Sequence, residues 1–159
     1  MGAVTRFLGN AGPIAAGILA FYDPFSAARL AGGIFIFAGV IGYCYPVPCK
    51  PSFTGPNSKL THTVARAFGI PFASNSNTVF VPAMGGRNLA AGLTISTLAY
   101  LEDKRAIGIL IAFWTLAGWA DIGILWTWRK QGSENTFVHV RNIAVLTGIA
   151  WGLLIEERG

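Results

Sequence analysis

Four long apolar stretches constrain this chain more than any other feature of its sequence. They cover residues about 28–46, 82–101, 106–128 and 137–155. A helix needs about 20 predominantly apolar residues to cross the roughly 30 Å hydrocarbon core of a bilayer. Hydrophobic residues make up 53% of the chain and charged residues only 12%, whereas a soluble domain carries about 25% charged residues. The sequence therefore predicts one transmembrane helical domain, residues 1–159.

The apolar stretches are expected to be helices. A membrane β-barrel needs many segments of about ten residues with alternating polarity, and no such alternation is sustained here. In lipid, a spanning segment must also satisfy its own backbone hydrogen bonds. We expect an all-α fold, an integral membrane four-helix bundle with a short N-terminal helix over 13–22. An interfacial amphipathic helix is expected in the first long loop, where an apolar stripe runs through Leu60, Val64, Ala67 and Phe68.

The charged and metal-ligating residues exclude several classes of function. The net charge is +5, but the basic residues are scattered between apolar stretches, so no nucleic-acid partner is expected. No His, Cys or carboxylate cluster has metal-site spacing, and no cofactor is expected. The expected partners are the lipid bilayer and an apolar small-molecule ligand or substrate, with a homo-oligomer or a membrane enzyme partner both open. Membrane orientation and a disulfide between Cys44 and Cys49 also stay open.

Three charged side chains interrupt the apolar stretches at similar depths. Each lies fifteen or sixteen residues from a charged residue at the end of its own stretch, which is about 22 to 24 Å along a helix. Neighbouring spans are antiparallel, so these three positions fall in one layer, short of the far edge of the hydrocarbon core. The pairs are Arg87 with Glu102, Asp121 with Arg105, and Arg141 with Glu156.

Asp121 is the most unusual of these residues, because apolar residues and glycine surround it. A charge at this position costs roughly 2.5 to 3.5 kcal/mol even on the lenient insertion scale, and an arginine from another helix would offset that cost. We expect Arg87 as its first partner and Arg141 as its second. His139 precedes Arg141 by two residues, so it is expected to point elsewhere on the helix, towards the interface.

Three main hypotheses explain these charges, and a proton or ion path, for which the chain offers one carboxylate and no relay, is a lesser alternative. The first is a polar pocket in a cofactor-free isomerase or cyclase that acts on an apolar biosynthetic intermediate. The second is a non-enzymatic membrane scaffold or accessory subunit, in which the charges only lock the helices together. The third is a binder or carrier of a lipid-like or anionic small molecule.

The first hypothesis assigns a role to each candidate residue. Asp121 would be the general base or a charge stabiliser, and Arg87 would neutralise developing oxyanion charge. The other candidates would position substrate oxygens (Arg141, Asn88 and Asn142) or form pocket walls (Trp119 and Trp114).

From about residue 30 onwards, the chain resembles a family of small four-helix membrane proteins of unknown function, found mainly in fungi. The marks of the resemblance are LAGGIFIFAGVIGYCYP, ARAFGIPF, GGRNLAAGL, the basic pair before the third apolar stretch (Lys104 and Arg105) and the aspartate of WADIGIL. The resemblance implies a four-helix bundle and genes that lie beside secondary-metabolite genes. It implies an accessory isomerase or cyclase, or a partner of one, and Arg87 and Asp121 stand at recurrent polar positions of the family. We expect the endoplasmic reticulum or another endomembrane as the location.

Overall fold

The computed structural model describes residues 11–44, 80–127 and 133–156, and the regular elements in these ranges are helices. This confirms the predicted all-α class for the described part of the chain. The interfacial helix expected near residues 59–68 lies outside the described residues, as does Cys49, so a disulfide between Cys44 and Cys49 stays open. The helices are α2 (Gly12–Ala20), α3 (Pro24–Cys44), α5 (Phe80–Tyr100), α6 (Lys104–Thr127) and α7 (Ser133–Glu156).

Aspartate caps begin two of the long helices. The backbone N–H of Ser26 donates to Asp23 Oδ1 at 3.0 Å at the start of α3, and the backbone N–H of Ala106 donates to Asp103 Oδ1 at 2.9 Å at the start of α6. Hydrogen bonds from the Ser26 hydroxyl and then from its backbone N–H hold the pKa of the Asp23 carboxyl below its ordinary value. Each cap satisfies an N–H that has no partner within its helix.

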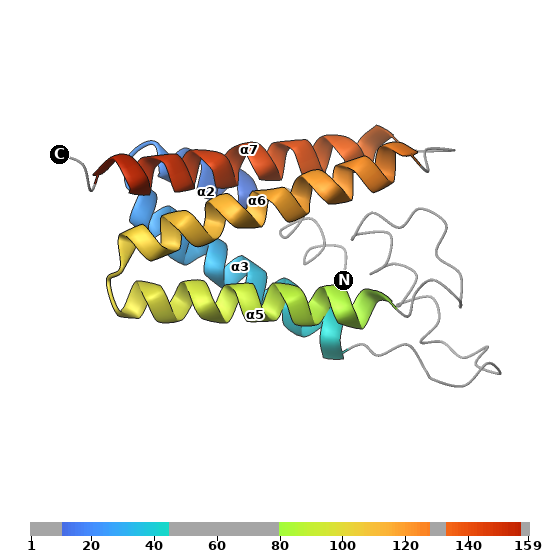
Figure 1. Cartoon of the computed structure of the whole chain (residues 1–159), viewed down its shortest axis with the longest axis horizontal. Coiled ribbons are helices and arrows are strands. Elements are labelled where there is room, and N and C mark those ends of the chain that lie inside the picture. Colours follow the sequence, from blue (N-terminus) through green and yellow to red (C-terminus); the bar gives the residue numbers. More distant parts are fainter. Residues whose placement is uncertain (1–10, 45–79, 128–132, 157–159) are drawn as a thin grey trace.

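A tight turn between α5 and α6 makes these two helices antiparallel (Figure 1). Within it, Glu102 adopts a left-handed conformation with φ of 56°. The N–H of Asp103 donates back to the carbonyl of Leu98 at 3.0 Å, which closes the end of α5 as a helix C-cap does.

Three of the described helices are long and apolar enough to cross a membrane. These segments are Pro24–Tyr43, Lys104–Gly123 and Phe137–Glu156, and they identify the chain as a membrane protein. The α5 helix is not among them, because Arg87, Asn88 and several glycines lower the hydropathy of its first half. A fourth span over 82–101, and with it the four-helix bundle, therefore stays a prediction.

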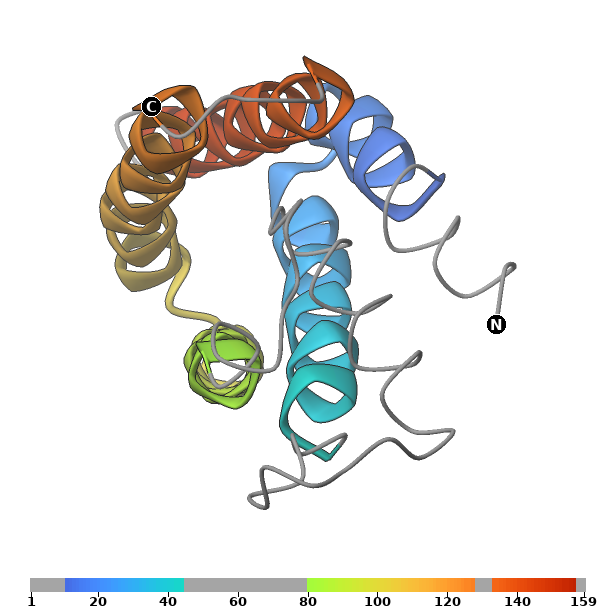
Figure 2. The ribbon, with the colours of Figure 1, turned by 90° about the vertical axis from the view of Figure 1, so that its right-hand side faces the viewer.

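The helices associate as two close pairs. The α3 helix packs along α5, and α6 packs along α7, while the short α2 helix lies against both α3 and α7 (Figure 2). From the turn at 101–103, α6 rises away from α5 towards α7 (Figure 1). The far ends of α5 and α6 therefore depend on side chains to connect them.

The buried aliphatic core gathers where α5 ends and α6 begins. It joins all five described helices, and Ile95, Ile107, Ile111, Ile149 and Leu153 are its largest fully buried side chains. Small residues of α3 complete it, namely Ala27, Ala28 and Ala31. Ala91, near the middle of α5, and Ile143, near the middle of α7, are buried hydrophobic residues outside this cluster. The packed core fixes the helices, and Arg87 and Asp121 lie beyond it along α5 and α6.

Glycines bring the backbones of α3 and α5 into contact. A Cβ added at Gly92 would lie 2.6 Å from the backbone nitrogen of Ile36, and one added at Gly85 would lie 2.5 Å from the carbonyl carbon of Gly42. Only a residue without a side chain fits at such distances. This contact fixes the rotation of α5 and so determines the direction of Arg87.

Candidate functional site

The predicted ion pair between Arg87 and Asp121 is present. Arg87 Nη2 of α5 donates to Asp121 Oδ2 of α6 at 3.1 Å. The Arg87 side chain remains 40% exposed and that of Asp121 remains 24% exposed. The pair therefore connects the two diverging helices without being sealed by the protein around it.

Trp114 also lies beside the Arg87 guanidinium. The guanidinium carbon is 5.8 Å from the centroid of the Trp114 ring, within the range of a cation–π contact. Trp114 also packs edge-on against Phe35 of α3, with ring centroids 6.0 Å apart and planes at 72°. Trp114 and Asp121 are two helical turns apart on one face of α6. Arg87 thus contacts both an aromatic ring and a carboxylate of α6.

Trp119 does not share that position. It is 56% exposed and lies about 140° around α6 from Trp114. The sequence places Trp119 beside Asp121, but two residues along a helix point to nearly opposite sides. Of the two tryptophans expected as pocket walls, Trp114 therefore adjoins the ion pair.

His139 of α7 joins this group, which sequence reasoning missed. The imidazole is half-buried and lies within electrostatic range of both Asp121 and Arg87. It comes one turn before Ile143, whose side chain would be 2.7 Å from a Cβ added at Gly118 of α6. His139 therefore faces α6, and its expected position at the membrane interface stays a prediction.

The sequence holds one signal that could have revealed His139, namely its spacing from Glu156, which forms an ion pair with Lys104. Lys104 Nζ of α6 lies 3.2 Å from Glu156 Oε2 of α7. Seventeen residues separate Lys104 from Asp121, and seventeen separate His139 from Glu156. Asp121 and His139 are thus at equal depth, about 25 Å from this reference pair.

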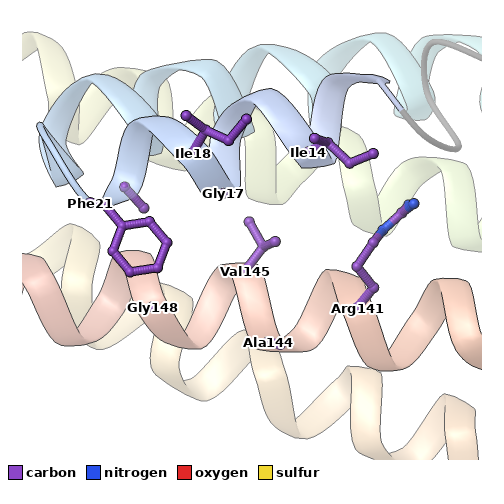
Figure 3. Close-up of a pocket in the computed structure, with 9 residues that line it drawn as sticks. Ile14, Gly17, Ile18, Phe21, Arg141, Ala144, Val145 and Gly148 are labelled. Atoms are coloured by element: carbon purple, nitrogen blue, oxygen red, sulfur yellow. The ribbon is translucent and has the colours of Figure 1, made fainter.

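Arg141 lies on a different face of α7. Its Nη2 and Nε atoms donate to Oδ1 of the adjacent Asn142 at 3.1 and 3.4 Å, and its side chain lines a groove against α2 (Figure 3). Arg87, and not Arg141, is thus the arginine beside Asp121. Asn142 accepts hydrogen bonds from Arg141. Asn88 is half-buried and follows Arg87 on α5.

The groove between α2 and α7 has a volume of about 400 Å³. Its lining is apolar apart from Arg141, and Asp121 does not line it. The polar pocket expected around Asp121 therefore stays a prediction. Within residues 11–44, 80–127 and 133–156, no three His, Cys, Asp or Glu side chains are grouped so as to hold a metal ion.

The fold and the ion pair define a helical membrane protein with charged side chains meeting between its helices. The chain belongs to the family described as a domain of unknown function (DUF4267), whose model matches residues 52–155. No match was found among curated proteins or among solved structures. Four of the five sequence marks lie inside the matched range, and the mark at 30–46 precedes it. The expected family of unknown function is confirmed, while a fungal origin and gene neighbourhood stay predictions.

Proposed function

We propose that this protein is a membrane-embedded enzyme that isomerises or cyclises an apolar biosynthetic intermediate without a cofactor. The site would consist of Arg87, Asp121 and His139, contributed by three helices. One observation carries the proposal: an ion pair between α5 and α6, close to the end of the apolar segment Lys104–Gly123, remains accessible on both of its side chains. Both residues lie near one depth, about 25 Å from the Lys104–Glu156 pair.

The accessibility of the pair argues for an occupied site. A pair that only locks two helices gains most when the protein surrounds it, because charges exposed to hydrocarbon are costly. Arg87 and Asp121 keep 40% and 24% of their side-chain surface. Water, a polar part of a ligand or another polar group must therefore cover them in a bilayer. A substrate whose oxygen atoms reach the pair, while its apolar body contacts Trp114, would meet that requirement.

The residue types suit proton transfer. The Asp121 carboxylate would remove a proton from a carbon or hydroxyl of the substrate, and Arg87 would stabilise the negative charge that develops on an adjacent oxygen. His139 would deliver a proton to a second carbon, so that one proton leaves and one returns while a double bond shifts or a ring closes. Substrate and product then have the same elemental composition.

The resemblance to proteins encoded beside fungal secondary-metabolite genes supports a biosynthetic intermediate as the substrate. An apolar intermediate partitions into the bilayer, where α5, α6 and α7 would meet it directly. The endoplasmic reticulum or another endomembrane is the compartment proposed for this reaction.

The proposal can be tested by deleting the gene and restoring it in separate strains as wild type, Asp121→Asn or Glu156→Gln. The Glu156→Gln variant is the matched control, because it removes a carboxylate from the ion pair at the other end of the helices. Wild type and Glu156→Gln should restore the product, and Asp121→Asn should accumulate a compound of identical mass. Full restoration by a membrane-inserted Asp121→Asn variant, or an accumulating compound of different mass, would reject the proposed reaction.

A structural lock in a non-enzymatic accessory subunit is the second candidate function. It is favoured by the divergence of α6 from α5 beyond their turn, since the Arg87–Asp121 pair joins helices that otherwise separate (Figure 1). Such a lock needs a cation and an anion but does not depend on which helix carries which. This difference separates the two candidates experimentally.

A further inference from the structure

We infer that the groove between α2 and α7 is a binding site for an anionic bilayer phospholipid. One acyl chain would lie in the groove, and the phosphate would contact Arg141. The site lies on the α2 face of α7, whereas His139 and Ile143 face α6. The inference therefore goes beyond the proposed function and does not depend on it.

The lining of the groove suits a hydrocarbon chain. Exposed apolar walls are formed by Ile14 and Ile18 of α2 and by Phe21 directly after it, at 48%, 60% and 91% exposure. The two helices meet at Gly17, where an added Cβ would be 3.0 Å from Val145 Cγ2. An added Cβ at Gly148 would meet nothing within 4 Å, so small residues of α7 leave the groove open.

Arg141 gives the groove a charged end. The groove extends along α7 from Arg141, beside Ile14, to Gly148, beside Phe21 (Figure 3), a distance of about 10 Å. A guanidinium has five N–H donors in a planar fork, which matches the geometry of a phosphate. The bonds to Asn142 Oδ1 orient the guanidinium within its helix and are compatible with donation to an anion.

The depth of Arg141 favours a bilayer lipid as the source of that anion. Arg141 is four residues inside the apolar segment that begins at Phe137, which is about 6 Å along the helix. A long arginine side chain can extend that far towards the headgroup layer while its methylene groups stay in apolar surroundings. The phosphate of a phospholipid lies at that level, and its acyl chain extends into the membrane along the groove.

Two substitutions test the two parts of the site. Arg141→Gln removes the charge, and Gly148→Leu fills the groove without meeting neighbouring atoms at its Cβ. Gly123→Leu is the matched control, because an added Cβ at Gly123 of α6 also meets nothing within 4 Å. Purified full-length protein in a neutral detergent would be titrated with dioleoylphosphatidylglycerol, dioleoylphosphatidylcholine or oleate, and bound lipid counted by native mass spectrometry.

Wild type and Gly123→Leu should bind phosphatidylglycerol saturably and at least tenfold more tightly than phosphatidylcholine. Arg141→Gln should lose this preference, and Gly148→Leu should weaken binding of both phospholipids about tenfold. Equal binding of the two phospholipids to wild type, or unchanged binding in both variants, would overturn the inference. If oleate binds saturably and phosphatidylglycerol does not bind, the assignment to a phospholipid would be overturned. Because lipid retention is measured rather than turnover, the result is independent of Asp121 chemistry.

Discussion

Lys104 and Glu156 form a 3.2 Å ion pair between the start of α6 and the end of α7. It lies about 25 Å along the helices from the Arg87–Asp121 pair. Both side chains of the Lys104 pair are more than 40% exposed, at a level where water and headgroups screen the charges. The two ion pairs therefore differ in surroundings, and their removal should have different consequences.

Neutralising one partner in each pair measures that difference. Glu156→Gln should lower the free energy of unfolding by no more than about 1 kcal/mol, as for exposed ion pairs. Asp121→Asn should lower it by about 1 to 3 kcal/mol, because Arg87 then lies against the apolar segment of α6 without its counter-charge. Unfolding of both variants in detergent, followed by circular dichroism, provides the comparison. Equal small losses would mean that solvent covers both pairs alike.

The glycine contact between α3 and α5 predicts that alanine lowers the stability of the protein at Gly92 but does not lower it at Gly33. Gly92→Ala should destabilise the protein by about 1 to 3 kcal/mol, because its Cβ would lie 2.6 Å from the backbone nitrogen of Ile36. Gly33→Ala is the control on α3, where an added Cβ meets nothing within 4 Å. Alanine favours a helix more than glycine does, so Gly33→Ala should be neutral or stabilising by up to about 1 kcal/mol. Thermal unfolding in one detergent tests both, and equal effects would contradict the packing.

The cap at Asp23 predicts a pH dependence of stability. The pKa of its carboxyl is lowered in the folded protein, chiefly by hydrogen bonds from Ser26. The ionised carboxylate therefore adds stability that is fully present above the unfolded pKa of about 3.9 and is lost as pH falls through the lower folded pKa. Asp23→Ala should cost roughly 0.5 to 1 kcal/mol near pH 7, as loss of an N-cap does.

The difference in stability between wild type and Asp23→Ala should stay constant from pH 7 to about pH 5 and narrow below about pH 4. Chemical unfolding at a series of pH values measures it. A difference that widens as the solution becomes more acidic would show that the neutral carboxyl, and not the carboxylate, is the stabilising form.

The sequence predicts the depth of the charged residues well, because depth depends only on counting along helices of constant rise. Arg87 and Asp121 lie fifteen and sixteen residues from charges at their helix ends, and they meet at 3.1 Å. The helix over 13–22 and the four long helices were predicted within a few residues, apart from α3 and α7, which each begin four residues earlier.

The rotation of each helix about its axis could not be predicted in the same way. The contact of Ile143 with Gly118 turns His139 towards α6, and the contact of Val145 with Gly17 turns Arg141 towards α2. These contacts join residues from different helices whose pairing a hydropathy pattern does not specify. The same limitation explains why Trp119 was grouped with Trp114, although the two residues point in different directions on α6.

The most direct test of the central claim is product formation by the charge-swapped double variant Arg87→Asp, Asp121→Arg. This variant keeps one cation and one anion between α5 and α6, but it moves the carboxylate to the opposite helix and away from its position relative to His139. The enzymatic account predicts a folded, membrane-inserted protein with stability closer to wild type than either single variant and no product. Product formation at the wild-type level would contradict it, because an ion pair of either polarity would then be sufficient.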